Sequence, residues 1–428
     1  MTTPIHVLLV SLRDPFMDSD RVMPPLGVMA LHAYLLELGI ASCLEIDFRF
    51  DRLEAYAHYT HIGISCMTPQ KEQAYRILRD IKARYPDIRV ILGGPHARYY
   101  QQECVRHPFD HIVVGDGELA LEEILTGRIP PEERVVSRPV SEEQMNRFPV
   151  PYREPGFLRN YDFVFQGIHA STLLTAKGCP MSCAFCEDAR TKVKKYRPEY
   201  VGRQIEQIKQ AGFEGVMFFD DVFTLSPHRV RELTAEIASH RIRYRCFGHA
   251  RTMTPEIAGL LSRTGCIETG VGVESGSQKI LDAVNKKTTV AQNRDYVRLC
   301  NSFGIRVKTF LMLGLPGENE ATIAETEAFL AFLMGERFTG HDGRTGCNDF
   351  DLTIYFPYVG TEIRRRIDAD EGQGIDLWFT SDPDRMSGFY KGVHGSSEVA
   401  VRTSALSAEA LIAAQQRLTR TYKRTGGP

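Results

Sequence analysis

The chain has 428 residues, 43% of them hydrophobic and 10% aromatic, and its 52 Lys and Arg nearly balance 54 Asp and Glu, which leaves a net charge of −2. This length predicts two or three domains, and the composition excludes a disordered chain and argues against a general nucleic-acid or anionic-membrane binder, which needs a basic surplus. No apolar run approaches the roughly 20 residues that span a bilayer, and residues 1–14 show no secretory signal, so we expect a cytoplasmic protein without a membrane span.

Short β-branched runs alternate with amphipathic segments over residues 1–130. We expect helices at Val28–Leu38 and Lys71–Tyr85. Strands are expected at Ile5–Leu12, Ala41–Asp47, His61–Ser65, Ile88–Leu92 and His111–Val114. Strands that alternate with helices predict an α/β domain, a parallel sheet wrapped by helices.

Ligands of such sheets bind outside the carboxyl ends of the strands. Four loops rich in glycine and small residues follow the predicted strands. Either a large flat or phosphate-bearing ligand approaches the backbone there, or the loops are only tight turns, and the spacing does not decide between the two. The candidate ligand-binding residues in these loops are Pro25, Leu26, Gly27, Ser65, Met67, Thr68, Gly93, Gly94, Gly115 and Gly117.

A second series of strand–helix units occupies residues 166–365, after a proline-rich stretch at 131–165 that we interpret as a linker. Its strands are expected at Ser171–Ala176, Gly215–Asp220, Tyr244–Gly248, Glu268–Glu274, Arg306–Met312 and Asp351–Phe356. Its helices are expected at Glu199–Ala211, Pro227–Ser239, Pro255–Arg263, Gln278–Val284, Val290–Phe303 and Glu320–Leu333. Six units predict a partial (β/α)6 TIM-type barrel, and the tail at 366–428 has one clear helix, Ala408–Tyr422.

A cluster of three cysteines follows the first strand of the second series. They are Cys179, Cys183 and Cys186. This is the face on which barrels build active sites. A [4Fe–4S] cluster has four ligand positions, so three thiolates leave one iron open to chelate an amine and a carboxylate. Zinc is the competing interpretation, but structural zinc sites show a second ligand pair, which is absent nearby. The cysteine cluster therefore favours an iron–sulfur centre.

The C-x3-C-x2-C spacing resembles the cluster motif of the radical S-adenosylmethionine (radical SAM) enzymes. The resemblance implies that the open iron binds S-adenosylmethionine, whose reductive cleavage releases a 5′-deoxyadenosyl radical. It also implies cofactor contacts for residues that follow the cysteine motif or end later strands. They are Phe185 near the adenine, Asp220 on the methionine amine, Glu274 and Ser275 on the ribose and methionyl end, and Lys308 on a carboxylate.

Helix capping at strand–helix turns is the alternative role for Asp220, Asp221 and Glu274. Asp221, His249 and Tyr355 end strands at the barrel mouth, where acid–base chemistry takes place. For His249 and Tyr355 the alternative is lining of a polar cavity.

The loops of the first domain resemble those of the Rossmann-like cobalamin-binding domain that precedes a radical SAM barrel in one large subclass. The histidine motif D-x-H-x-x-G is missing, so we expect cobalamin without a ligating histidine from that motif. A domain that has lost cobalamin would lack the motif equally. His96 lies on the ligand edge and is expected to be a loop or cap residue rather than a cobalt ligand.

Together the two resemblances imply a cobalamin-dependent methyltransferase that acts on a small molecule or natural-product intermediate, with the barrel mouth facing the ligand edge of the sheet. An external electron donor such as flavodoxin or ferredoxin would supply the reducing electron. The alternative is a cobalamin-free dehydratase, lyase or epimerase acting on a sugar or aminocyclitol. A third hypothesis, a non-enzymatic sensor, predicts no 5′-deoxyadenosine. RNA is disfavoured as substrate, since no second cysteine cluster or basic appendage is present.

Overall fold

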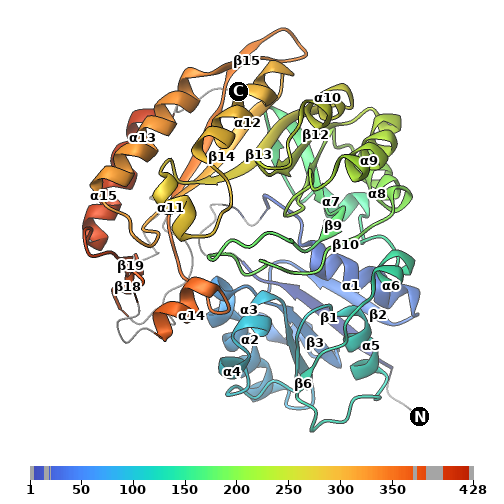
Figure 1. The fold of residues 1–428 in the computed structure, drawn as a ribbon. Helices are drawn as coiled ribbons and strands as arrows, with labels where there is room; N and C mark the ends of the chain where they lie inside the picture. Colours follow the sequence, from blue (N-terminus) through green and yellow to red (C-terminus); the bar gives the residue numbers. More distant parts are fainter. Residues whose placement is uncertain (1–3, 14–18, 20, 370–373, 382–398, 424–428) are drawn as a thin grey trace. The chain divides into compact units, whose positions relative to one another are not determined.

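The computed structural model describes residues 4–13, 19, 21–369, 374–381 and 399–423. The chain divides into two compact units, residues 1–162 and 163–428 (Figure 1). Each unit has its own sheet, and each is described by itself below.

The first unit is built on a six-stranded sheet with the order β2-β1-β3-β4-β5-β6, in which all neighbours are parallel. Its strands are β1 (His6–Ser11), β2 (Ala41–Glu45), β3 (His61–Ser65), β4 (Arg89–Gly93), β5 (His111–Val113) and β6 (Val135–Val136). The predicted Rossmann-like architecture is confirmed. The strand order reverses between β1 and β3, and such a switch point opens a crevice for ligands at the carboxyl edge.

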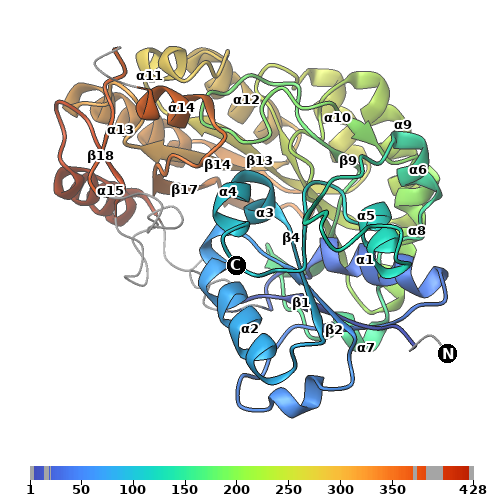
Figure 2. The ribbon, with the colours of Figure 1, turned by 90° about the horizontal axis from the view of Figure 1, so that it is seen from below.

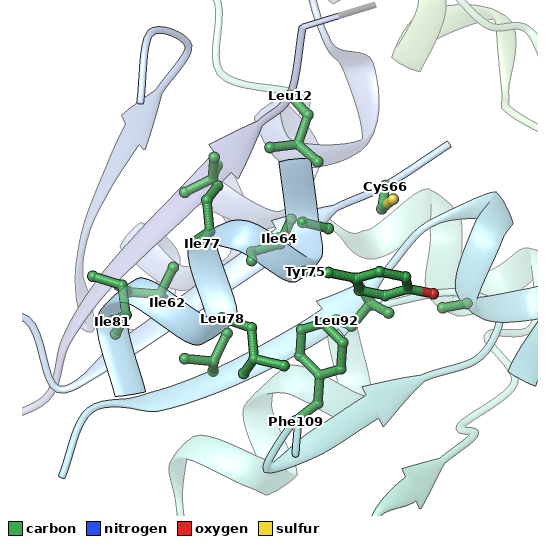
Figure 3. Close-up of a cluster of buried hydrophobic side chains, with 14 of the residues drawn as sticks. Leu12, Ile62, Ile64, Cys66, Tyr75, Ile77, Leu78, Ile81, Leu92 and Phe109 are labelled. Atoms are coloured by element: carbon green, nitrogen blue, oxygen red, sulfur yellow. The ribbon is translucent and has the colours of Figure 1, made fainter. Parts of the chain in front are cut away.

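Helices cover both faces of this sheet, with α2 on one side and α1 and α5 on the other (Figure 2). The helices and 3-10 turns are α1 (Leu26–Glu37), η1 (Leu53–Tyr56), η2 (Thr68–Gln70), α2 (Lys71–Arg84), α3 (Pro95–Tyr99), α4 (Gln101–Cys104), α5 (Glu118–Leu125), α6 (Glu142–Arg147) and α7 (Pro155–Leu158). Figure 3 shows the α2 side, where Ile77, Leu78 and Ile81 pack against the strand residues Ile62 and Ile64. Buried aliphatic side chains at helical spacing therefore fix α2 to the strands.

The proline-rich segment that we interpreted as a linker is structured up to Asp162. Its Val135 and Val136 form β6, which extends the sheet beyond β5, and the Val136 side chain is fully buried. The Tyr152 N–H donates to the carbonyl of Met29 in α1. The prolines therefore interrupt helices and strands without detaching the segment, since β5 offers it a free sheet edge to pair with.

The second unit is a curved sheet with the order β17-β14-β13-β12-β11-β8-β7, in which β7 alone is antiparallel to its neighbour. Its strands are β7 (Val164–Phe165), β8 (Ile168–Leu173), β11 (Gly215–Phe218), β12 (Arg243–Gly248), β13 (Cys266–Glu274), β14 (Arg306–Leu313) and β17 (Asp349–Ile354). Its helices are α8 (Pro198–Gln210), α9 (Pro227–His240), α10 (Pro255–Arg263), α11 (Gln278–Ala283), α12 (Val290–Ser302) and α13 (Glu320–Gly335). The predicted partial barrel is confirmed.

The first barrel strand ends earlier than expected, at Leu173. Residues 176–177 form instead a separate short strand, β9 (Ala176–Lys177), which pairs with β10 (Lys194–Lys195). This hairpin carries the cysteine loop. The shift arises because the Asp220 carboxylate binds the backbone N–H groups of Thr175 and Ala176 and so turns the chain away from the sheet.

The C-terminal segment packs on the far edge of the barrel. It contains α14 (Glu362–Asp368), β18 (Trp378–Phe379), β19 (Val401–Arg402) and α15 (Ala408–Tyr422), and the hairpin of β15 (Arg337–Thr339) and β16 (Thr345–Cys347) precedes β17. The Gln415 side chain of α15 donates to the Leu352 carbonyl of β17. Among the residues with described structure, no helix combines the length and the apolar character needed to cross a membrane.

The core of the first unit is tested by replacing Leu78 with alanine. Leu78 is fully buried in α2, so we expect Leu78→Ala to lower the free energy of unfolding by about 2–5 kcal/mol, measured by urea denaturation of the full chain. Leu36 on α1 is 47% exposed, and Leu36→Ala is the matched control with an expected loss of about 0.5 kcal/mol or less. Equal losses for the two variants would contradict this assignment of the core.

Candidate active site

The three cysteines lie on one loop between β9 and β10. The loop closes at its base, where the Cys179 N–H donates to the Thr191 hydroxyl at 2.8 Å and the Thr191 N–H donates to the Cys179 carbonyl at 2.9 Å. Gly178 has a φ of +95°, and a Cβ there would lie 2.5 Å from the Lys192 carbonyl oxygen. Only glycine permits this closure. The hydrogen bonds at the base therefore hold the two ends of the loop together, and the loop carries all three thiols.

The thiols of Cys179, Cys183 and Cys186 influence one another. Burial raises the pKa of all three, to about 12 for Cys186, and the Cys183 thiol adds to the rise at both of the others. Among the described residues, no three His, Cys, Asp or Glu side chains converge as ligands of one ion. A cubane cluster needs no such convergence, because its cysteines bind different irons. The loop therefore suits a [4Fe–4S] cluster, and metal binding would offset the cost of forming buried thiolates.

A buried ion pair lies beside the cysteine loop. Lys286 Nζ lies 2.7 Å from Glu274 Oε1, and both residues are 7% exposed. The same ammonium lies 5.8 Å from the centre of the Phe185 ring. Burial opposes the charge of Lys286, yet Glu274 and then Cys183 outweigh burial and raise the pKa of the ammonium. A fixed positive charge therefore stands next to the thiols.

The backbone at the end of β13 is shaped to hold this pair. Glu274 has a φ of +64°, and the register with β14 shifts between Gly272 and Glu274. A Cβ at Gly272 would collide with the Glu274 carboxylate and lie 3.0 Å from Lys286 Nζ. Sequence analysis missed Lys286, because its position in a turn after α11 gives no signal of its own. The preceding residue Asn285, with a φ of +55°, marks that turn.

His249 and Asp221 lie near the same loop. His249 is 5% exposed, its Nδ1 accepts the Arg251 N–H at 3.2 Å, and its Nε2 has no hydrogen-bond partner among the described residues. Burial, with Lys286 and Arg251, lowers its pKa to about 3, so the imidazole is neutral. Asp221 accepts the Gly178 N–H, and burial raises its pKa. His249 therefore offers an unoccupied nitrogen.

Tyr355 is fully buried just after β17. Burial raises the pKa of its hydroxyl, which lies near Thr361 and Glu187. The Ile363 N–H of α14 donates to the Ala184 carbonyl of the cysteine loop at 3.0 Å. The structure therefore places Tyr355 on the α14 side of the loop.

The Asp220 carboxylate accepts hydrogen bonds from within the fold. Its carboxylate accepts the Thr175 N–H at 2.6 Å, the Ala176 N–H at 3.3 Å and the Thr175 hydroxyl. Burial raises its pKa to about 6. These contacts hold the connection between β8 and β9 and cap no helix, so they differ from the capping role that we kept as an alternative. The implied contact of Asp220 with a methionine amine stays a prediction.

Ser275 and Lys308 also have partners inside the protein. The buried Ser275 hydroxyl lies 3.1 Å from the Thr326 hydroxyl. Lys308 points into the barrel as expected, but it meets Asp349 at 3.6 Å and Asp351 at 3.0 Å. It is the third residue of β14, so it stands near the start of the strand rather than at the mouth. The implied cofactor carboxylate is replaced there by two carboxylates of β17.

Three phenylalanines line the inside of the barrel. The ring centres of Phe219 and Phe247 lie 5.7 Å apart, and those of Phe247 and Phe310 lie 5.9 Å apart. Gly270 makes this row possible, because a Cβ there would lie 2.7 Å from the Phe247 ring. Phe219 remains 46% exposed. An apolar wall, which sequence analysis did not single out, therefore faces the open interior; the alternation of side chains along β12 and β14 was the available signal.

The glycines of the first unit divide into two groups. A Cβ at Gly27 or Gly115 would meet no atom within 4 Å, so a ligand can approach the backbone there. A Cβ at Gly94 would lie 2.8 Å from the Cys66 backbone, and one at Gly117 would lie 3.0 Å from the Leu31 side chain, so these two serve tight packing.

The other predicted ligand-binding residues of the first unit lie at or just beyond strand ends and at helix starts. Met67 is 42% exposed at the carboxyl end of β3. Pro25 caps α1, Leu26 opens it, Ser65 and Gly93 end β3 and β4, and Thr68 opens η2.

His96 is closed off from the ligand edge. It is fully buried, its Nε2 lies 2.9 Å from the Tyr75 hydroxyl, and its Nδ1 lies 3.4 Å from the Thr68 hydroxyl. Burial lowers its pKa to about 4. His96 lies in the short helix α3 rather than in a loop, and both of its ring nitrogens have partners in the fold.

Comparison with known proteins identifies both units. Residues 173–330 match the radical SAM superfamily, and residues 18–125 match the B12 binding domain. An uncharacterized methyltransferase of Pyrococcus horikoshii is 25% identical over 79% of this chain and 77% of its own. The anaerobic magnesium-protoporphyrin IX monomethyl ester cyclase of Rubrivivax gelatinosus is 26% identical over 71% of this chain and 61% of its own.

The solved structure of the radical SAM methyltransferase TsrM from Kitasatospora setae has the same fold. It superposes with a TM-score of 0.76 at 19% identity, over 97% of this chain and 91% of that one. The chain therefore contains a radical SAM domain, over residues 173–330, and a B12-binding domain, over residues 18–125. The first domain type implies a [4Fe–4S] cluster and S-adenosylmethionine, and the second implies cobalamin.

Glu318, at the carboxyl end of β14, makes the stability of the barrel depend on pH. It is fully buried and accepts the Gly314 N–H at 3.1 Å and the Thr322 hydroxyl at 2.9 Å, and burial raises its pKa from 4.5 to about 7. Because the folded pKa lies above the unfolded one, the folded state binds this proton more tightly. We therefore expect stability to fall as the pH rises from 4.5 through about 7.

Glu318→Gln removes this ionisation, so we expect a flatter dependence of unfolding free energy on pH over that window, measured by chemical denaturation. Glu325→Gln, at an exposed position of α13, is the control and should retain the slope of the unaltered chain. An unchanged slope in Glu318→Gln would contradict the assignment.

Proposed function

We propose that this enzyme is a cobalamin-dependent radical SAM methyltransferase that transfers a methyl group to a small molecule. The observation that carries the proposal is the cysteine loop with the buried Lys286–Glu274 pair beside it, in a chain that also has a B12-binding domain. Relatives named as methyltransferases support the reaction type, including the Pyrococcus horikoshii protein and TsrM. TsrM was solved with cobalamin and a [4Fe–4S] cluster bound.

Cys179, Cys183 and Cys186 would hold the cluster, which when bound supplies the electron that cleaves S-adenosylmethionine to a 5′-deoxyadenosyl radical. The Lys286–Glu274 pair presents one positive and one negative group beside the loop. These charges complement the carboxylate and the ammonium of a methionyl group. The pair would therefore orient the amino-acid end of the cofactor, and Phe185 would cover its apolar side.

The barrel interior would bind the substrate. The row of Phe219, Phe247 and Phe310 supplies an apolar surface that excludes water, which protects a reactive radical from side reactions. His249 is neutral and its Nε2 lacks a partner in the described part of the chain, so it can accept a hydrogen bond or a proton from the substrate. Asp221 and Tyr355 are further candidates for proton transfer.

Cobalamin would bind at the carboxyl edge of the first sheet, where Gly27 and Gly115 leave the backbone accessible and Met67 is exposed. His96 is engaged within the fold, so we propose a cobalt without a ligand from this histidine. Flavodoxin or ferredoxin would deliver the electron. The B12-binding match disfavours the cobalamin-free elimination or epimerisation that we kept as an alternative.

The proposal is tested by anaerobic reconstitution of the full chain with iron, sulfide, hydroxocobalamin and methyl-labelled S-adenosylmethionine under reduction. We expect cobalamin to co-purify, 5′-deoxyadenosine to form, and label to enter the corrin and then an acceptor from a small-molecule extract. Alanine at each cluster cysteine should abolish 5′-deoxyadenosine, whereas Cys43→Ala, at an exposed position, should not. Full turnover without cobalamin would overturn the methyl-transfer assignment, and full iron content in the triple alanine variant would overturn the cluster assignment.

Lys286 is tested against its neighbour Lys287. We expect Lys286→Met to weaken binding of S-adenosylmethionine about tenfold or more, because a charge-assisted hydrogen bond is worth about 1.5–3 kcal/mol. Lys287 is exposed, so Lys287→Met should leave the affinity unchanged. Binding is measured by equilibrium dialysis on the reconstituted protein, and Lys286→Arg should restore most of the affinity. Equal affinities for both methionine variants would remove Lys286 from the cofactor site.

A further inference from the structure

A second cavity opens at the end of the barrel where the parallel strands begin. Its volume is about 670 Å³, within the range of small-molecule sites. It lies under the β15–β16 hairpin, and Figure 1 shows β15 at the upper end of the second unit, far from β9 and β10. The cysteine loop joins β9 to β10, so this cavity lies at the opposite end of the barrel from the candidate active site. We call it the lower pocket because the end where the strands begin is the bottom of a (β/α) barrel, although this end is at the top in Figure 1. The strand residues that line it are Ile168, Arg243, Ile267, Arg306 and Asp349.

The lower pocket has a positive surplus. Its lining contains four permanent cations and two carboxylates, which leaves two positive charges in excess. The cations are Arg243, Arg306, Arg344 and Lys423, and the carboxylates are Asp342 and Asp349. Such a surplus in a concave site attracts anions.

The cations differ in how far their charge is neutralised. Arg306 lies 3.2 Å from Glu268, and Lys423 lies 2.9 Å from Asp349. Arg344 lies 3.6 Å from Asp342 at an exposed position, where water screens the pair. The Arg243 side chain, by contrast, has no hydrogen bond or ion pair among the described residues, although its backbone pairs with Gly215 of β11, and it is exposed at the start of β12. The charge of Arg243 is therefore available to a ligand.

A layer of ion pairs fills the barrel next to the lower pocket. Arg245 and Arg306 each lie 3.2 Å from one oxygen of Glu268, and Lys308 bridges Asp349 and Asp351. These side chains point inward from consecutive strands. Arg245 and Lys308 each precede a phenylalanine of the row, Phe247 or Phe310, by two residues on the same strand, so this layer of ion pairs stands between the lower pocket and the phenylalanine row.

The remaining wall of the lower pocket is apolar. It is formed by Ile168, Ile267, Met334 and Phe338. We propose that the lower pocket is a second ligand site, which takes an organic anion: a carboxylate or phosphate group bound by Arg243 and Arg344, attached to an apolar body that packs on the isoleucines and Phe338.

The test uses phenyl phosphate and benzoate as probes, with phenol as the neutral comparison, titrated calorimetrically into the full chain. We expect saturable binding of at least one anion and no saturable binding of phenol. Arg243→Gln and Arg344→Gln should each weaken the anion about tenfold or more, as expected for loss of a charge-assisted hydrogen bond. Arg203→Gln, at an exposed position on α8 outside the pocket, is the matched control and should bind as the unaltered chain does.

The two probes distinguish a phosphate site from a carboxylate site, and either result supports the proposal. Absence of saturable binding for both anions would overturn it, as would equal affinities in the two glutamine variants and the control. Saturating S-adenosylmethionine on the reconstituted enzyme should leave the probe affinity unchanged, and displacement of the probe would refute a separate site. None of these readouts depends on methyl transfer, so the lower pocket and the proposed function succeed or fail independently.

Discussion

The placement of charge beside buried thiols is the constraint on which the barrel mouth depends. Thiolates are costly to form in a buried loop, and burial indeed raises the pKa of all three cysteines. The ammonium group of Lys286 lies beside the loop and pairs with the Glu274 carboxylate at 2.7 Å. Removing one partner of a buried ion pair typically costs about 3–5 kcal/mol, so the pair is a demanding feature to keep.

Charge is layered along the barrel. Paired arginines, lysines and carboxylates fill the end where the strands begin, the phenylalanine row occupies the middle, and the cysteine loop with neutral His249 lies at the mouth. These paired charges satisfy one another and form a layer across the barrel, as side-chain layers do in closed barrels. Glycines of β13 make room for the larger side chains of neighbouring strands, which leaves the middle layer apolar and open.

The first unit shows how one sheet edge combines two kinds of glycine. Gly94 and Gly117 allow close packing inside the domain, whereas Gly27 and Gly115 face free space. The sequence presents all four alike. The sequence analysis did not expect His96 to be a cobalt ligand, and the structure adds the physical reason, since Tyr75 and Thr68 engage both of its ring nitrogens.

Local pattern alone determined the two sheets, most helix boundaries and the cysteine motif, because periodicity, proline starts and ligand spacing are properties of neighbouring residues. Helix α10 and helix α15 have the predicted bounds, Pro255–Arg263 and Ala408–Tyr422. Tertiary structure decided which polar side chains remain available. The sequence indicated cofactor contacts for Asp220, Ser275 and Lys308, and in the structure each contacts a residue distant in sequence. Lys286 lies beside the cysteine loop although its turn carries no motif. Hydrogen bonds and ion pairs between residues far apart in sequence depend on how strands register and helices pack, which no local pattern records.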